Sequence, residues 1–199
     1  MIPVKSMTEE EINSVAEAFA DYSYEEKDKG LEFLIPNRNK IIEYVKVIVR
    51  SGLESNMVYT NSPTREGFII ITDTTKPISV ISVLKMLKNM IKVLGLKNFI
   101  NFTKKCQSGG ISIETKLRKE KKQFIQVELL AIRKEFQGKG YMRSLINNAY
   151  ELAAKKNLPC ILTTDAKLKN DKYVHLGMNL VNIRKIDENS CLYDLYKEF

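Results

Sequence analysis

The sequence predicts a mixed α/β fold in which helices and short strands alternate along all 199 residues. Two observations indicate this class. Hydrophobic residues make up 44% of the chain, which is enough for one folded core. Their spacing switches repeatedly between helical and strand-like periods. Because no repeat, low-complexity tract or clear linker divides the chain, we expect residues 1–199 to form a single domain.

Two helices are expected before any strand. Thr8 and Glu11 have the spacing of a capping box, and apolar residues follow at helical intervals, which predicts a helix over residues 9–22. Asn37 is suited to cap a second helix, and we expect Gly52 to end it.

A β-hairpin and a long helical segment come next. Residues 56–61 and 67–72 are rich in β-branched and aromatic side chains, and the polar residues between them predict the turn of a hairpin. Residues 78–102 return to helical spacing, with one interruption expected at Gly95. The basic run at residues 116–122 is interpreted as a solvated hairpin or loop.

The second half of the chain begins with a strand, a short loop and a helix. Its predicted elements are a strand at 124–132, a helix at 140–156, a strand at 160–164, a helix at 167–176 and a closing hairpin formed by 180–186 and 192–196. The edge strand of this hairpin offers a contact through which two copies could form a homodimer.

The charge of the chain raises the question of a polyanionic partner. The net charge is +8 and the pI is about 9.2. The lysines are scattered, and the basic run has no aromatic residues for base stacking, so we expect no nucleic-acid partner. The alternative, a nucleic-acid-binding protein, predicts a steeply salt-dependent affinity. A cofactor with several phosphates would also favour a positive field around its site.

The termini and the rare residues exclude several other classes. The first residues lack the apolar stretch of a secretory signal, and no segment is apolar enough to span a membrane, so a cytoplasmic protein without a membrane partner is expected. Cys106, Cys160, Cys191 and the single histidine, His175, fit neither a disulfide framework nor a metal cluster. We expect Cys160 and Cys191 to be small buried residues and His175 to have a surface or capping role.

The loop after the strand at 124–132 has the layout of an anion site. Gly138 and Gly140 would let the backbone approach an anion, and the first N–H groups of the next helix lack intrahelical partners. Lys139 adds a positive charge. Taken alone, the pattern also fits ordinary turn chemistry, and the Walker and Rossmann patterns are absent.

Two motifs make the assignment more specific. Residues 137–142 read Gln-Gly-Lys-Gly-Tyr-Met, and residues 173–178 read Tyr-Val-His-Leu-Gly-Met. The first resembles the acetyl-CoA motif Gln/Arg-x-x-Gly-x-Gly/Ala of the GNAT superfamily of N-acetyltransferases, and the second is similar to the Tyr-x-x-x-Gly-Phe helix end of that superfamily. Met142 departs from the first motif and Met178 from the second. The resemblance covers the C-terminal part of the chain.

This resemblance implies a particular fold and a separate role for each of three segments of the chain. The fold would be a central mixed, mainly antiparallel twisted sheet of about six to seven strands, with helices on both faces and splayed central strands. Residues 1–123 would hold acceptor-binding elements, residues 124–178 the acyl-CoA-binding core and residues 179–199 the C-terminal hairpin.

The resemblance also implies that acetyl-CoA is the cosubstrate and that no metal takes part. The pantetheine arm would lie between the splayed strands like an added strand, and the glycine-containing loop would bind the pyrophosphate. The residues expected to bind the cofactor are Leu130, Ala131, Ile132, Gln137, Gly138, Lys139, Gly140, Tyr141, Met142 and Asn170. Asn170 could instead cap its helix.

Acyl transfer to an amine needs a neutral nucleophile, a stabilised oxyanion and a proton for the departing thiolate. The resemblance implies that Tyr173 protonates the thiolate, and its alternative role is aromatic packing. Glu128 is the candidate base for the amine, and its alternative role is a solvated charge or a salt bridge. A backbone N–H near Leu130 would meet the oxyanion.

The expected activity is therefore transfer of an acetyl group to a primary amine by direct attack in a ternary complex. The alternative is a non-catalytic acyl-CoA-binding sensor or regulatory module. The acceptor would be a small-molecule amine or a protein amino group. The aromatic residues that would line its pocket, or else belong to the core, are Phe19, Tyr22, Tyr24, Phe33 and Tyr59.

Overall fold

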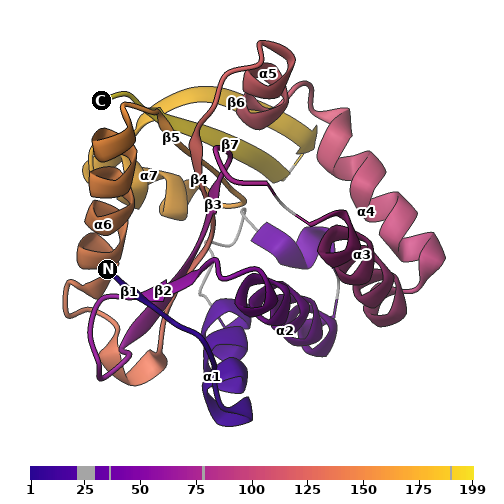
Figure 1. Ribbon diagram of the computed structural model, residues 1–199. Coiled ribbons are helices and arrows are strands. Elements are labelled where there is room, and N and C mark those ends of the chain that lie inside the picture. The colour runs from indigo at the N-terminus through magenta and orange to yellow at the C-terminus, as the bar shows by residue number, and fades with distance from the viewer. Residues whose placement is uncertain (22–29, 36, 78, 189) are drawn as a thin grey trace.

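A seven-stranded sheet forms the centre of the computed structural model, which describes residues 1–21, 30–35, 37–77, 79–188 and 190–199 (Figure 1). The strands are β1 (Ile2–Pro3), β2 (Val58–Thr60), β3 (Gly67–Asp73), β4 (Ile125–Ile132), β5 (Cys160–Thr164), β6 (Asn179–Asp187) and β7 (Ser190–Lys197). Their order across the sheet is β1-β2-β3-β4-β5-β7-β6. Neighbouring strands are antiparallel except β4 and β5, which are parallel.

Helices cover both faces of this sheet, as the sequence predicts (Figure 1). They are α1 (Glu9–Ala20), the 3-10 helix η1 (Gly30–Phe33), α2 (Arg38–Glu54), α3 (Val80–Leu94), α4 (Leu96–Ser108), α5 (Ile113–Lys119), the 3-10 helix η2 (Lys134–Phe136), α6 (Tyr141–Lys156) and α7 (Lys167–His175). Within the described parts of the chain, no helix has the length and apolar character that crossing a membrane requires.

The two faces of β3 show how the core is divided. Phe68 and Ile70 belong to the cluster that contains the buried residues of α1 and α2. Ile69 and Ile71 belong to the cluster on the opposite face, under α6. A strand that is buried on both sides needs apolar residues at every position, which explains why this segment is a continuous apolar run.

Local capping interactions begin the first two long helices where the sequence predicts. The backbone N–H of Glu11 donates to Thr8 Oγ1 at 3.1 Å, and the Glu11 carboxylate accepts from the backbone N–H of Thr8 at 2.8 Å. Asn37 Oδ1 accepts from the backbone N–H of Lys40 at 3.2 Å. These bonds satisfy helix donors that have no intrahelical partner.

Gly52 does not end α2, contrary to the prediction. The helix continues to Glu54, and Gly52 is buried where α2 crosses the sheet. A Cβ atom at this position would lie 3.1 Å from Val58 Cγ2 and 3.2 Å from Ile70 Cδ1. Glycine therefore allows close packing of the helix on β2 and β3, because a larger residue would require these side chains to shift.

The prediction of a hairpin or loop at 116–122 is wrong, because α5 covers most of this run. Ser112 caps the helix by accepting a hydrogen bond from the backbone N–H of Thr115 at 3.1 Å. Leu117 is buried in a small cluster with Phe124. One buried leucine among exposed basic residues gives a short helix little periodicity in sequence.

The expectation that helices precede any strand is also wrong, because β1 comes first. Ile2 pairs with Thr60 and Pro3 with Tyr59 at the edge of the sheet. A two-residue strand has no detectable alternation, and proline is tolerated there because an edge strand needs fewer ladder hydrogen bonds.

Three helices, α3, α4 and α5, separate β3 from β4 in sequence although these strands are neighbours in the sheet (Figure 1). Gly95, with φ of 80°, separates α3 from α4, which confirms the predicted interruption. The predicted start of this segment, Ile78, lies outside the described residues.

A buried ion pair joins the helical segment to the C-terminal strands. Arg184 Nε donates to Asp194 Oδ2 at 3.0 Å, and both side chains are almost fully buried. Arg184 also donates to the backbone carbonyl of Cys106 in α4, and Asp194 accepts from the backbone N–H of Ile113 in α5.

Candidate active site

The parallel strands β4 and β5 separate partway along their length. Their register pairs Ile125 with Cys160 and Val127 with Leu162, and no pairing follows. β4 continues to Ile132, so its later residues have no partner on β5. Because backbone groups of a strand that face such a gap can bind an extended ligand, this splay is suited to a chain-like molecule.

A β-bulge in β4 lies where the strands separate. Ile70 pairs with Leu129 and Ile71 pairs with Val127, which leaves Glu128 without a register partner on β3. An extra residue of this kind changes the direction of side chains and is common beside active sites.

The Glu128 carboxyl is held by its neighbours and has a strongly shifted pKa. Its Oε1 accepts from Thr72 Oγ1 at 2.6 Å, and its Oε2 accepts from Gln126 Nε2 at 3.2 Å. Glu128 is exposed to solvent within the site, but the protein atoms packed around its carboxyl desolvate it and raise its pKa to about 7. The Thr72 hydrogen bond and the charge of Arg118 lower the pKa, whereas the charge of Glu114 raises it.

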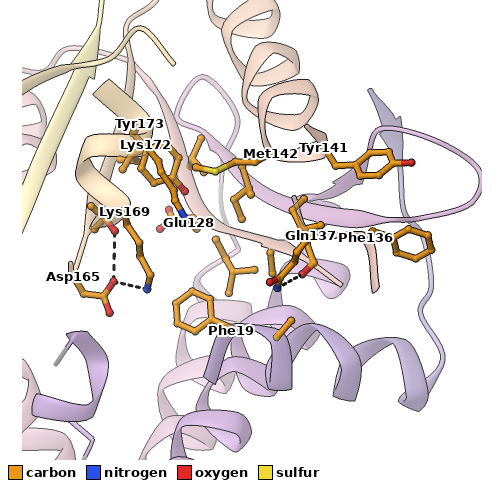
Figure 2. A pocket seen from close by; sticks show the side chains of 18 of the residues that line it. Phe19, Glu128, Phe136, Gln137, Tyr141, Met142, Asp165, Lys169, Lys172 and Tyr173 are labelled. Atoms are coloured by element: carbon orange, nitrogen blue, oxygen red, sulfur yellow. Dashed lines mark hydrogen bonds and ion pairs between the residues drawn. The ribbon is translucent and has the colours of Figure 1, made fainter. Parts of the chain in front are cut away.

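A cavity of about 430 Å³ occupies the gap between the splayed strands. Its walls come from β4, the end of β5, the start of α6, α7 and one turn of α1. In Figure 2, Tyr173 and Glu128 lie in one half of the view, while Gln137 and Tyr141 lie in the other. The side chain of Met142 lies between these two groups.

The loop before α6 leaves helix donors unpaired at the cavity. Gly138 and Gly140 have φ values of 75° and 83°, a backbone conformation that favours glycine. A Cβ atom built at either position would meet no atom within 4 Å, so the backbone is open on this side. Gly140 precedes the first helical residue, Tyr141, and makes no side-chain capping bond. The first N–H groups of α6 are therefore suited to bind an anion.

Most of the residues expected at the site line this cavity. They are Glu128, Leu130, Ala131, Ile132, Gln137, Gly138, Gly140, Tyr141, Met142 and Tyr173. Lys139 and Asn170 are not among the described lining residues. Lys139 Nζ donates to the backbone carbonyl of Glu135 at 2.9 Å. Asn170 is buried, and it does not cap α7, because that helix begins after Ala166.

An ion pair in the cavity was not predicted from the sequence. Lys169 Nζ lies 2.7 Å from Asp165 Oδ1, and both side chains are largely buried (Figure 2). Asp165 Oδ2 accepts from the backbone N–H of Leu31 at 2.7 Å, and Lys169 Nζ lies 4.6 Å from the centre of the Phe19 ring. The spacing of four residues is a known signal for a helix-face pair, but it does not indicate a cavity.

His175 and Cys160 lie where the sequence predicts, whereas Cys191 does not. His175 is exposed, with Nε2 3.4 Å from a guanidinium nitrogen of Arg143. Burial raises the pKa of the Cys160 thiol to about 12, so this thiol is protonated at neutral pH. Cys191 is half-buried rather than buried.

The aromatic residues predicted to line an acceptor pocket do not share one site among the described residues. Phe19 lines the cavity. Lys105 Nζ lies 4.3 Å from the ring centre of Phe33, and Tyr59 packs against the core cluster under α6. Tyr22 and Tyr24 lie outside the described residues.

The fold and this site match a known family. Residues 62–176 match the family described as the acetyltransferase (GNAT) family. The match covers more than half of the chain, so the chain belongs to the GNAT acetyltransferase family, whose shared chemistry is acyl transfer. A search among curated proteins finds no match by sequence.

Solved structures share the fold over almost the whole chain. The C-terminal condensation domain of Ebony in complex with β-alanyl-dopamine has a TM-score of 0.60 and 12% identity, with 96% of this chain and 93% of that chain covered. PH1933 from Pyrococcus horikoshii OT3 has a TM-score of 0.58, 14% identity and coverage of 99% and 96%. Arylalkylamine N-acetyltransferase 2 from Aedes aegypti has a TM-score of 0.56, 14% identity and coverage of 97% and 96%. At these identities the likeness is one of fold.

Proposed function

We propose that the chain is an acetyl-CoA-dependent N-acetyltransferase that acetylates a primary amine by direct attack in a ternary complex. One observation carries this proposal. A single cavity in the gap between β4 and β5 is lined by the glycine-containing loop, by Glu128 and by Tyr173. Acetyl-CoA has a charged pyrophosphate and a reactive thioester. The loop would bind the pyrophosphate, and Glu128 and Tyr173 would act at the thioester, so both must lie in one site.

Each part of acetyl-CoA has a candidate partner. The pyrophosphate is bound by N–H groups of residues 138–142 at the start of α6, where the helix dipole also favours negative charge. The pantetheine arm lies along the backbone of residues 130–132, which have no partner on β5. A backbone N–H near Leu130 stabilises the oxyanion.

The reaction then needs two proton transfers. Glu128 accepts a proton from the bound ammonium, and the neutral amine attacks the thioester carbonyl to form the C–N bond. The C–S bond breaks as the tetrahedral intermediate collapses, and Tyr173 donates a proton to the thiolate. The second proton lost by the amine nitrogen restores Tyr173, and the proton on Glu128 passes to solvent. The products are the amide and free coenzyme A.

Replacement of Tyr173 by Phe tests the assignment. We expect turnover with acetyl-CoA and an amine panel to decrease about a hundredfold, while the calorimetric affinity for acetyl-CoA is retained. Tyr150→Phe is a matched control, because Tyr150 is buried in α6 and is not among the described lining residues of the cavity. Full activity of Tyr173→Phe would remove Tyr173 from the mechanism.

Assays of the wild-type protein distinguish an acetyltransferase from a non-catalytic acyl-CoA-binding module. Acetylation of at least one primary amine with release of coenzyme A supports the enzyme. Tight acetyl-CoA binding without acetylation of any amine, across small amines and peptide amino groups, would instead favour a non-catalytic acyl-CoA-binding module.

A further inference from the structure

A second cavity, of about 290 Å³, lies between α2, α3 and the sheet. Tyr44 of α2, Met57 next to β2, and Met86 and Met90 of α3 contribute to its lining. One wall therefore comes from the helical segment that separates β3 from β4 in sequence.

Glu128 lines both cavities. The bulge leaves this residue without a partner on β3, and its carboxylate is held by the hydroxyl of Thr72, which also lines the second cavity. Glu128 is therefore the one residue, among the described lining residues, that a ligand in either cavity can contact.

We propose that the second cavity holds the apolar body of the acceptor and that its ammonium binds the Glu128 carboxylate, which lines both cavities. This inference rests on the proposed function, since the acetyl thioester would come through the first cavity. The acceptor class is a primary monoamine with an aromatic or unbranched apolar body.

The lining of the second cavity favours this class. Glu128 is the only charged side chain among the described residues that line it, and the other polar groups are hydroxyls such as those of Ser51 and Ser82. A second ammonium, as in a polyamine, or the carboxylate of an amino acid would find no opposite charge there. Methionine side chains adapt their shape to aromatic rings and to aliphatic chains.

The size of the cavity fits the same class. Its volume of about 290 Å³ is roughly twice that of an engineered cavity of about 150 Å³ that binds benzene. A phenyl ring with a short aliphatic chain fits this space. A peptide with several ordered side chains does not.

The acyl chain of a longer acyl-CoA is the competing occupant, because it is also apolar. Such a chain would have to pass the Glu128 carboxylate and would desolvate it without offering a hydrogen bond or a charge. An ammonium compensates the same carboxylate. The position of Glu128 therefore favours the amine.

Filling the cavity tests the proposal. Met86→Trp places a larger side chain in the lining, and Leu84→Trp on the same helix is the matched control, because Leu84 is 61% exposed. With saturating acetyl-CoA, we expect Met86→Trp to lower kcat/KM for 2-phenylethylamine about tenfold or more. It should leave kcat/KM for methylamine within about twofold, and Leu84→Trp should change neither. Met86→Ala, which enlarges the space, should improve the relative use of 4-phenylbutylamine and serves if Met86→Trp does not fold.

A binding measurement separates this inference from the proposed function. Calorimetry of 2-phenylethylamine with the wild-type protein loaded with coenzyme A should show binding, and Met86→Trp should lose it. Loss of octanoyl-CoA use by Met86→Trp with unchanged amine binding would assign the cavity to the acyl chain and overturn the proposal.

Equal losses of kcat/KM for methylamine and 2-phenylethylamine, or a preference of the wild type for spermidine or lysine, would also overturn it. If no amine is acetylated, the proposed function fails, and amine binding still decides the occupant of the cavity.

Discussion

The pH dependence of acetyl transfer should reflect the shifted pKa of Glu128. The carboxyl has a pKa of about 7 in place of its ordinary 4.5. If its carboxylate form is the base, then at about pH 5 only roughly 1% of the protein is active, whereas an unshifted glutamate would leave about three quarters active. We therefore expect kcat/KM for the amine to rise about tenfold per pH unit up to neutral pH and then to level off. Initial rates of thiol release at saturating acetyl-CoA measure this profile.

Glu128→Gln is the control for this profile. It should lose the inflection near neutral pH and reduce kcat/KM by about a hundredfold or more. A wild-type inflection near pH 4.5, or a Gln variant that keeps the wild-type profile, would refute the role of Glu128. The pH dependence of stability tests the same pKa without an activity assay. Because folding raises the pKa of Glu128, the folded state binds more protons than the unfolded state between about pH 4.5 and about pH 7. The free energy of unfolding therefore decreases across that window as the pH rises. The Gln variant should lack this contribution.

Three further predictions test the surroundings of the site. Glu114→Gln should move the inflection of the Glu128 profile to lower pH and Arg118→Gln should move it to higher pH, since their charges raise and lower this pKa; shifts in the same direction would contradict this account. Met142→Ala should bind acetyl-CoA at least as tightly in a calorimetric titration, because the family motif has a small residue there, and a large loss of affinity would show that the loop is assigned wrongly. Asp194→Asn leaves a buried guanidinium without its charged partner and should lower the free energy of unfolding in urea by about 3–5 kcal/mol, so a loss under about 1 kcal/mol would mean that the ion pair contributes little.

Much of the candidate site follows from local sequence. Gly138 and Gly140 are required by the positive φ angles of one loop, and the helix that follows leaves its first N–H groups unpaired. These properties depend on neighbours within a few residues, so the motif predicted them. Lys139 shows the limit of local reasoning. The motif predicts that Lys139 binds the cofactor, but its ammonium donates to the backbone carbonyl of Glu135.

The sequence by itself determined the fold class, most of the strands, the N-terminal caps of α1 and α2 and the positions of Glu128 and Tyr173 on their elements. The tertiary structure alone decided which of these residues meet. The bulge at Glu128, the hydrogen bond from the backbone N–H of Leu31 to Asp165 and the cavity between Tyr44 and Met86 all join segments far apart in sequence. Periodicity and capping report contacts within one or two turns or strands, whereas burial by distant segments sets the pKa of Glu128 and makes it the residue that both cavities share.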